Sequence, residues 1–149
     1  MGNMRDQNSI VSVYGFDLDT GSSVGTVLMT YTCPAGKGAI CHSWFVQETD
    51  TEGGIGLYFV RPSADDGGTE SSLLIEDKRE NSLPNPLNSA LIYYPNNTQL
   101  NIHMNALDRL EVRVTLDSGF AGTSEFNVLL NIEEVGPMPM VGTVVEGTA

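Results

Sequence analysis

The sequence predicts an all-β domain, an antiparallel β-sandwich or jelly-roll-like fold of about nine strands with no substantial helix. Three observations lead to this fold class. Apolar and polar residues alternate with a period of two, and turn residues separate the alternating segments at intervals of about eight to twelve residues. In addition, no stretch of about a dozen residues carries a sustained helical stripe.

The clearest alternation lies in the C-terminal half of the chain. In LEVRVTL (residues 110–116) the apolar residues fall on one face, and Glu111, Arg113 and Thr115 fall on the other. EFNVLLNIE (125–133) alternates in the same way, as does QLNIHMNA (99–106), in which His103 lies on the polar face. These three segments are therefore predicted to be half-buried strands.

Six earlier segments fit the same class with less regular alternation: Ile10–Asp17, Thr26–Thr32, Ala39–Glu48, Ile55–Arg61, Ser71–Glu76 and Ala90–Tyr94. Turn-forming residues separate them, as in Pro34-Ala35-Gly36 and Asp66-Gly67-Gly68. Trp44 and Tyr58 lie within these segments, where aromatic residues usually pack in the core. A carbohydrate-binding module, which would use such rings as a sugar platform, is kept as an alternative.

The chain is predicted to form one domain with two terminal segments. Residues 1–9 form a flexible N-terminal segment, residues 10–135 the sandwich, and residues 136–149 an extended C-terminal arm. Pro137 and Pro139 cannot continue a strand ladder, so the last strand should end near Val135. The arm is either a frayed terminus or an assembly arm that docks on a neighbour through Met138, Met140, Val141, Val144 and Val145.

Charge and hydropathy restrict the partners. The 149 residues include 7 Lys and Arg against 19 Asp and Glu, a net charge of −12, which disfavours nucleic acid. No apolar run reaches the length of a membrane span. The N-terminal MGNMRDQNSI has no apolar core of a secretory signal, so we expect neither a signal peptide nor a membrane contact.

The stretch DLDTGSS (Asp17–Ser23) contains Asp-Thr-Gly-Ser, which resembles the catalytic turn of pepsin-type and retroviral-type aspartic proteases. The resemblance implies a homodimeric enzyme in which Asp19 of each copy forms the catalytic dyad. GGIGLYF (53–59) is similar to the glycine-rich flap of those enzymes. However, Asp17 and Gly25 occupy flanking places that are normally apolar, and the later apolar-apolar-Gly segment that precedes a helix in those enzymes is missing. We therefore interpret the stretch as a strand end and a polar turn, with Gly21 at positive φ.

The remaining reactive residues form no recognisable motif. Asp17, Asp19, Asp50 and Glu52 have oxygen ligands suited to calcium but lack the full loop pattern, so no metal or other cofactor is predicted. No nucleophile motif surrounds His42 or His103, so no catalytic residue is assigned. Cys33 and Cys41 are expected to be buried thiols, with a cross-strand disulfide as the alternative.

The stretch VLMTYTCPAGKGAICHSWFV (27–46) resembles a pattern in small β-sandwich proteins of tailed-phage virions. In that pattern an apolar strand ends in Tyr-Thr-x-Pro-Ala-Gly-Lys and a second apolar strand follows. Tyr31 and Thr32 match it here, as does the turn Pro34, Ala35, Gly36 and Lys37. TDTEGGIGLYFV (49–60) and LNIHMNALDRLEVRV (100–114) are similar to later parts of the pattern, whereas Cys33 and Cys41 replace its usual Val or Ile.

The resemblance implies a non-enzymatic structural protein of a phage virion, most specifically a capsid decoration protein. Such a protein is made in the host cytoplasm and resides in the virion. Its expected partners are the major capsid protein or another virion protein, together with further copies of itself in a small closed ring, with a trimer favoured.

Overall fold

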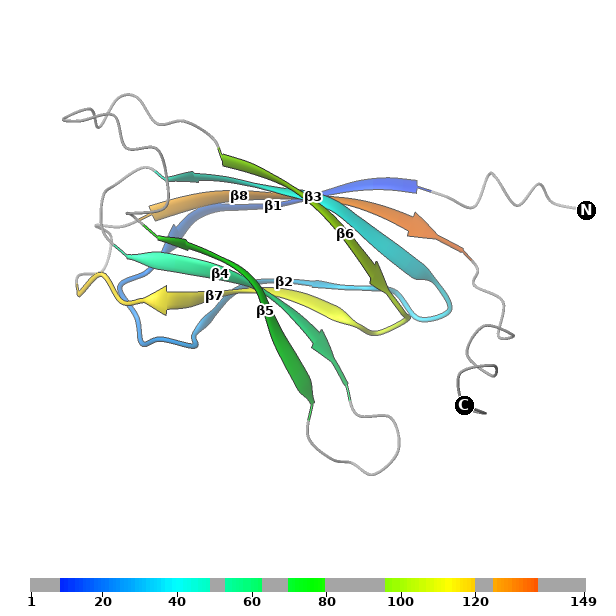
Figure 1. Cartoon of the computed structure of the whole chain (residues 1–149), viewed down its shortest axis with the longest axis horizontal. Helices are drawn as coiled ribbons and strands as arrows, with labels where there is room; N and C mark the ends of the chain where they lie inside the picture. The colour runs from blue at the N-terminus through cyan, green and yellow to red at the C-terminus, as the bar shows by residue number, and fades with distance from the viewer. Residues whose placement is uncertain (1–8, 49–52, 63–69, 80–95, 120–124, 137–149) are drawn as a thin grey trace, which may run out of the picture.

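The computed structural model describes residues 9–48, 53–62, 70–79, 96–119 and 125–136. In these residues the chain forms two antiparallel sheets of four strands each, in the orders β1-β8-β3-β6 and β2-β7-β4-β5. Figure 1 shows the two sheets facing each other as the layers of a sandwich. The all-β antiparallel fold predicted from the sequence is therefore confirmed, and none of the described residues is helical.

The strands follow the predicted segments closely. They are β1 (Ser9–Asp19), β2 (Val27–Thr32), β3 (Gly38–Glu48), β4 (Gly54–Arg61), β5 (Ser71–Arg79), β6 (Asn96–Met104), β7 (Arg109–Leu116) and β8 (Glu125–Val135). The last strand ends at Val135, as the following prolines indicated. The predicted strand Ala90–Tyr94 lies outside the described residues, as do residues 1–8 and the arm residues 137–149.

The core lies between the two sheets. The largest fully buried side chains include Trp44 and Phe126 from one sheet and Leu57 and Leu110 from the other. Along β8 buried residues alternate with half-buried ones, because one face of a central strand packs on the opposite sheet. Each fully buried apolar side chain contributes about 1.5–3 kcal/mol, so this interface is the main stabilising element of the fold.

A polar cluster joins β5 and β6, which are edge strands of opposite sheets. The Glu76 carboxylate accepts hydrogen bonds from Trp44 Nε1 at 2.6 Å and from Thr98 Oγ1 at 2.7 Å. Lys78, which is almost fully buried, donates to Thr98 Oγ1 at 2.9 Å and lies 3.0 Å from Glu76. These bonds tie the two sheets together at one side of the sandwich.

One end of the sandwich collects several chain connections (Figure 1). The β2–β3 turn, the β6–β7 turn and the end of β8 all lie at this end, where β1 also begins. The strand register supports this arrangement, since Gly38 at the start of β3 pairs with Val135 at the end of β8. No helix in the described part of the chain is long and apolar enough to cross a membrane.

Candidate functional site at the Pro34–Lys37 end of the sandwich

The Pro34–Lys37 segment forms a tight turn between β2 and β3. The Lys37 amide donates to the Pro34 carbonyl at 3.2 Å, which closes a β-turn. Gly36 has a φ of 78°, the positive value that a tight reversal at this position requires. Ala35 and Gly36 are exposed, so the turn presents its backbone to solvent.

A second turn, Asn105–Asp108, lies beside the first. The Asp108 amide donates to the Asn105 carbonyl at 3.1 Å, and the Asp108 carboxylate accepts from the Asn105 amide at 2.8 Å. Cys33 joins the two turns, because its amide donates to the Asp108 carbonyl and its carbonyl accepts from the Leu107 amide, both at 2.9 Å. Arg61 fixes Asp108 with two hydrogen bonds of 3.1 and 2.8 Å.

Leu107 is the unusual residue of this second turn. Its φ is 71°, in the left-handed region that L-residues with a branched side chain rarely adopt, yet its side chain is 52% exposed. Neither helical nor strand structure demands this conformation, since Leu107 lies between β6 and β7. Strained backbone positions cluster at functional sites, which makes Leu107 a candidate contact point.

Lys37 connects the first turn to the end of the last strand. Its Nζ lies 3.6 Å from Glu134 Oε1, and Tyr31 donates its hydroxyl to Glu134 Oε2 at 2.8 Å. Gly136 packs so closely on Lys37 that a Cβ there would lie 2.7 Å from Lys37 Cγ. Burial and the Glu134 carboxylate both raise the pKa of Tyr31, which therefore stays a hydrogen-bond donor. The turn thus holds the chain at the point where the C-terminal segment begins.

The two cysteines are free and buried, which confirms the expectation of two thiols. Burial is the main cause that raises the pKa of each thiol to about 11. Because the thiolate is the reactive species, both groups are chemically inert at neutral pH. Their role in the described structure is packing beneath the turn that separates them.

The Asp-Thr-Gly-Ser stretch forms the end of β1 and a packed turn. Asp19 Oδ1 accepts a hydrogen bond from the Gly21 amide at 2.7 Å, and Thr20 is fully buried. The prediction of positive φ at Gly21 is wrong, because the positive values occur at Asp17 and Gly25 instead. The Asp19 side chain caps the turn locally, so Gly21 does not need the left-handed conformation.

The other candidate residues are separated in space. His42 contacts Glu133 at 2.9 Å and His103 contacts Asn101 at 3.1 Å, both at the surface. Asp50 and Glu52 of the calcium hypothesis lie outside the described residues. Among the residues that the structure does describe, no group of three His, Cys, Asp or Glu side chains is placed to hold a metal ion.

Trp44, Tyr58 and Phe59, three aromatic residues of the central strands, are covered by the protein itself. Trp44 is fully buried in the core, as predicted. The Arg113 guanidinium lies 4.4 Å from the centroid of the Tyr58 ring, and that of Arg61 lies 5.2 Å from the Phe59 ring. A sugar would have to displace these cation–π contacts to stack on either ring.

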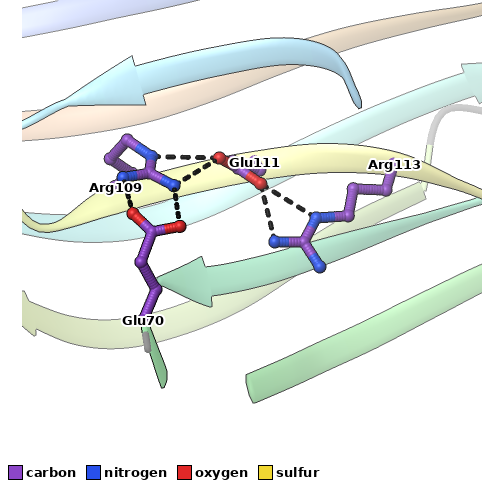
Figure 2. A network of polar contacts seen from close by, with 4 residues as sticks. All are labelled: Glu70, Arg109, Glu111 and Arg113. Atoms are coloured by element: carbon purple, nitrogen blue, oxygen red, sulfur yellow. Dashed lines mark hydrogen bonds and ion pairs between the residues drawn. The ribbon is translucent and has the colours of Figure 1, made fainter. Parts of the chain in front are cut away.

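A charge network on β7 was not expected from the sequence. Figure 2 shows Glu111 between Arg109 and Arg113, with Glu70 on the far side of Arg109. Arg109 forms two hydrogen bonds with Glu70, of 2.6 and 3.0 Å, and Glu111 receives bonds from Arg109 at 3.0 Å and Arg113 at 2.9 Å. Hydrogen bonds from Arg109 hold the pKa of Glu70 below its usual range.

The spacing of the residues contained a signal for this network. Residues 109, 111 and 113 share one face of a strand, so their charges alternate in a single row. This row buries Glu111, although its position on the polar face of an alternating strand is typical of solvent exposure. Glu70 completes the row from a distant part of the chain.

No protein-family model matches the sequence, and no curated protein does either. Among solved structures, the chain is similar to one in the structure of infectious bursal disease virus, Gx strain, with 12% identity over 93% of this chain and 43% of that chain and a TM-score of 0.44. It is also similar to a mutant VP2 protein of infectious bursal disease virus in derived T=1 particles, with 11% identity over 90% of this chain and 37% of that chain and a TM-score of 0.43. The present chain thus spans less than half the length of either.

Proposed function

We propose that this chain is a non-enzymatic structural protein of a virion, and specifically a capsid decoration protein of a tailed phage. The observation that carries the proposal is the Pro34–Lys37 turn. The residues that resemble the phage pattern form an exposed turn at one end of the sandwich, and Lys37 holds the exit of the C-terminal segment through Glu134 and Gly136. The residues of this pattern form an exposed turn in addition to packing in the core. The pattern therefore supports a role in binding a partner.

The partner in this proposal is the major capsid protein or a neighbouring virion protein. The docking surface is the end formed by the two adjacent turns, with the exposed and strained Leu107 as its apolar contact. The net charge of −12 supports a protein partner over packaged nucleic acid, because phosphates would be repelled. Self-association of copies on the shell belongs to the same proposal.

Binding to empty phage heads tests the proposal. Purified protein is mixed with heads that lack it, and co-sedimentation is measured for the wild type, Leu107→Asp and Leu116→Asp. Leu107 precedes β7 and Leu116 is its last residue, and their side chains are 52% and 40% exposed. The pair therefore introduces the same charge at opposite ends of one strand.

We expect the wild type and Leu116→Asp to bind heads, and Leu107→Asp to bind at least about tenfold more weakly, since a charge replaces an apolar contact at the interface. Asp tolerates the left-handed conformation, so Leu107→Asp should keep the fold. Failure of the wild type to bind heads would refute the decoration role. Equal loss in both variants would refute the assignment of this end as the docking surface.

A further inference from the structure

β1 is one of the two edge strands of its sheet, and β6 is the other. β1 pairs with β8 on one side, and no other strand in the described part of the chain pairs with it on the opposite side. From Ser9 to Gly15 the pairing with β8 is regular, so the strand has no bulge over these residues. Half of its backbone N–H and C=O groups along this stretch point outward, and such a row is a template for another strand.

The three remaining edges of the sandwich, β2, β5 and β6, are less suited to pairing. β6 is uncharged apart from His103, but its register with β3 is irregular and its Thr98 is bonded to Glu76 and Lys78 of β5. β5 carries four consecutive charged residues, Glu76, Asp77, Lys78 and Arg79. β2 has only six residues, and its register shifts between Val27 and Met29. By contrast, β1 has no charged residue from Ser9 to Phe16. Charges and bulges are the usual protection of a sheet edge, and this stretch of β1 has neither.

The side chains on the outer face of β1 are apolar and exposed. Ile10, Tyr14 and Phe16 are 74%, 58% and 66% exposed, and the rings of Tyr14 and Phe16 stack with centroids 5.8 Å apart. Tyr14 also lies opposite Leu129 of β8, which in turn lies opposite Phe45 of β3. The apolar surface therefore extends inward from the free edge across three strands.

A bulge ends this edge at Phe16. The register with β8 shifts between Gly15 and Leu18, and Asp17 has a φ of 54°. The Asp17 amide donates to Asn127 Oδ1 at 3.0 Å, so the Asn127 side chain satisfies a group that the ladder leaves unpaired. The bulge restricts further strand pairing to the uncharged residues before it.

We propose that two copies of this chain associate through β1, with the two strands antiparallel and related by a two-fold axis, so that their four-stranded sheets form one continuous sheet. An identical antiparallel strand can satisfy the outward backbone groups of both copies at once. A chain with a net charge of −12 repels its own copies, so they can approach only through an uncharged surface, and Ser9–Phe16 is one.

The two-fold symmetry also matches the side chains. An axis that passes through Val13 places Ile10 of each copy opposite Phe16 of the other copy, on the same face of the joined sheet. It places Asp17 opposite Ser9 of the other copy, so the acidic ends lie apart. This inference does not depend on the proposed virion role, and it replaces the three-fold ring expected from the sequence with a two-fold pair.

Sedimentation equilibrium of the full chain over a range of concentrations tests the pairing. We expect a monomer–dimer equilibrium with a dimer of twice the 16.0 kDa of one chain. Tyr14→Glu should weaken the dimer by at least about tenfold, because it places a charge in the uncharged edge. Leu73→Glu is the matched control, since Leu73 is 61% exposed on β5, the edge strand of the other sheet, and this variant should dimerise like the wild type.

Amide hydrogen exchange of the wild type locates the contact without any substitution. Exchange in Ser9–Gly15 should slow as the protein concentration rises, whereas exchange in β5 should not change. A wild type that stays monomeric at all concentrations would overturn the proposal, and so would a species of three chains. A dimer without protection of β1, or a Tyr14→Glu variant that folds and dimerises normally, would overturn it as well.

Discussion

Lys37 lies 3.6 Å from Glu134, and this ion pair joins the turn after β2 to the end of β8. The two residues are far apart in the sequence, but both contribute to the end of the sandwich where the chain passes into its C-terminal segment. The contact gives the Pro34–Lys37 turn a structural partner as well as an exposed surface.

Gly36→Val should lower the free energy of unfolding by about 1–3 kcal/mol, because a β-branched residue is strained at positive φ. Among the described residues, its two chain neighbours apart, no heavy atom lies within 4 Å of a Cβ built at Gly36, so a collision is not the cause. Gly36→Asn is the control, since Asn adopts this conformation more readily. Urea denaturation measures the free energy of unfolding of both variants. If Gly36→Val is as stable as the wild type, valine is not strained at this position.

Leu107→Asn should raise the free energy of unfolding by about 1 kcal/mol, because Asn relieves the left-handed strain of an exposed leucine. The same variant should bind phage heads more weakly if Leu107 is the docking contact. Thermal denaturation and co-sedimentation measure the two effects. A variant that is less stable than the wild type would contradict the account of Leu107 as a strained surface residue.

Glu111→Ala should destabilise the protein by about 1–3 kcal/mol, since Arg109 and Arg113 would lose the buried carboxylate that both contact. Glu70→Ala removes an exposed partner of the same network and should destabilise the protein less than Glu111→Ala does. Chemical denaturation of the two variants side by side measures the difference. If both variants lose the same free energy of unfolding, the burial of Glu111 does not add to the stabilisation by this network.

Stability should fall in acid through Glu76. Burial raises the pKa of this carboxyl group, but hydrogen bonds from Thr98, Trp44 and Lys78 outweigh that effect and hold the pKa below its usual value. Because the folded pKa is the lower one, the stabilisation is present above the unfolded pKa and is lost as the pH falls through the folded pKa.

The variant Glu76→Gln tests this pH dependence. Its deficit in unfolding free energy should be largest near neutral pH and should shrink in acid, where the wild-type carboxyl is protonated. Denaturation curves of both proteins across this range measure the deficit. A deficit that is independent of pH would assign the effect to packing instead of charge.

Deletion of residues 137–149 should leave the sandwich folded and weaken head binding. The deletion keeps Gly136, which packs on Lys37, and begins after the last strand has ended at Val135. Circular dichroism and co-sedimentation provide the two measurements. A truncated protein that binds heads like the full chain would reject the role of Met138, Met140, Val141, Val144 and Val145 as an assembly arm.

The sequence by itself determined the all-β class, the positions of the described strands and the end of β8 at Val135. These features depend on neighbours along the chain, because alternation sets the buried face of a strand and proline stops a ladder within one or two residues. The conformation of Gly36 belongs to the same class. A proline two residues earlier and the need for a tight reversal are both local conditions.

Only the tertiary structure determined the strand order and the positions where the burial or backbone conformation of a residue departs from its local preference. Glu111 is buried because Arg109 and Arg113 hold it, while Glu70 reaches Arg109 from another part of the chain. Asp17 has positive φ because it lies in the bulge of β1, where Asn127 of β8 accepts a hydrogen bond from its amide. The contacts of Glu70 with Arg109 and of Asp17 with Asn127 join residues that are distant in the sequence, and their energy outweighs the preference of any single residue for its local conformation.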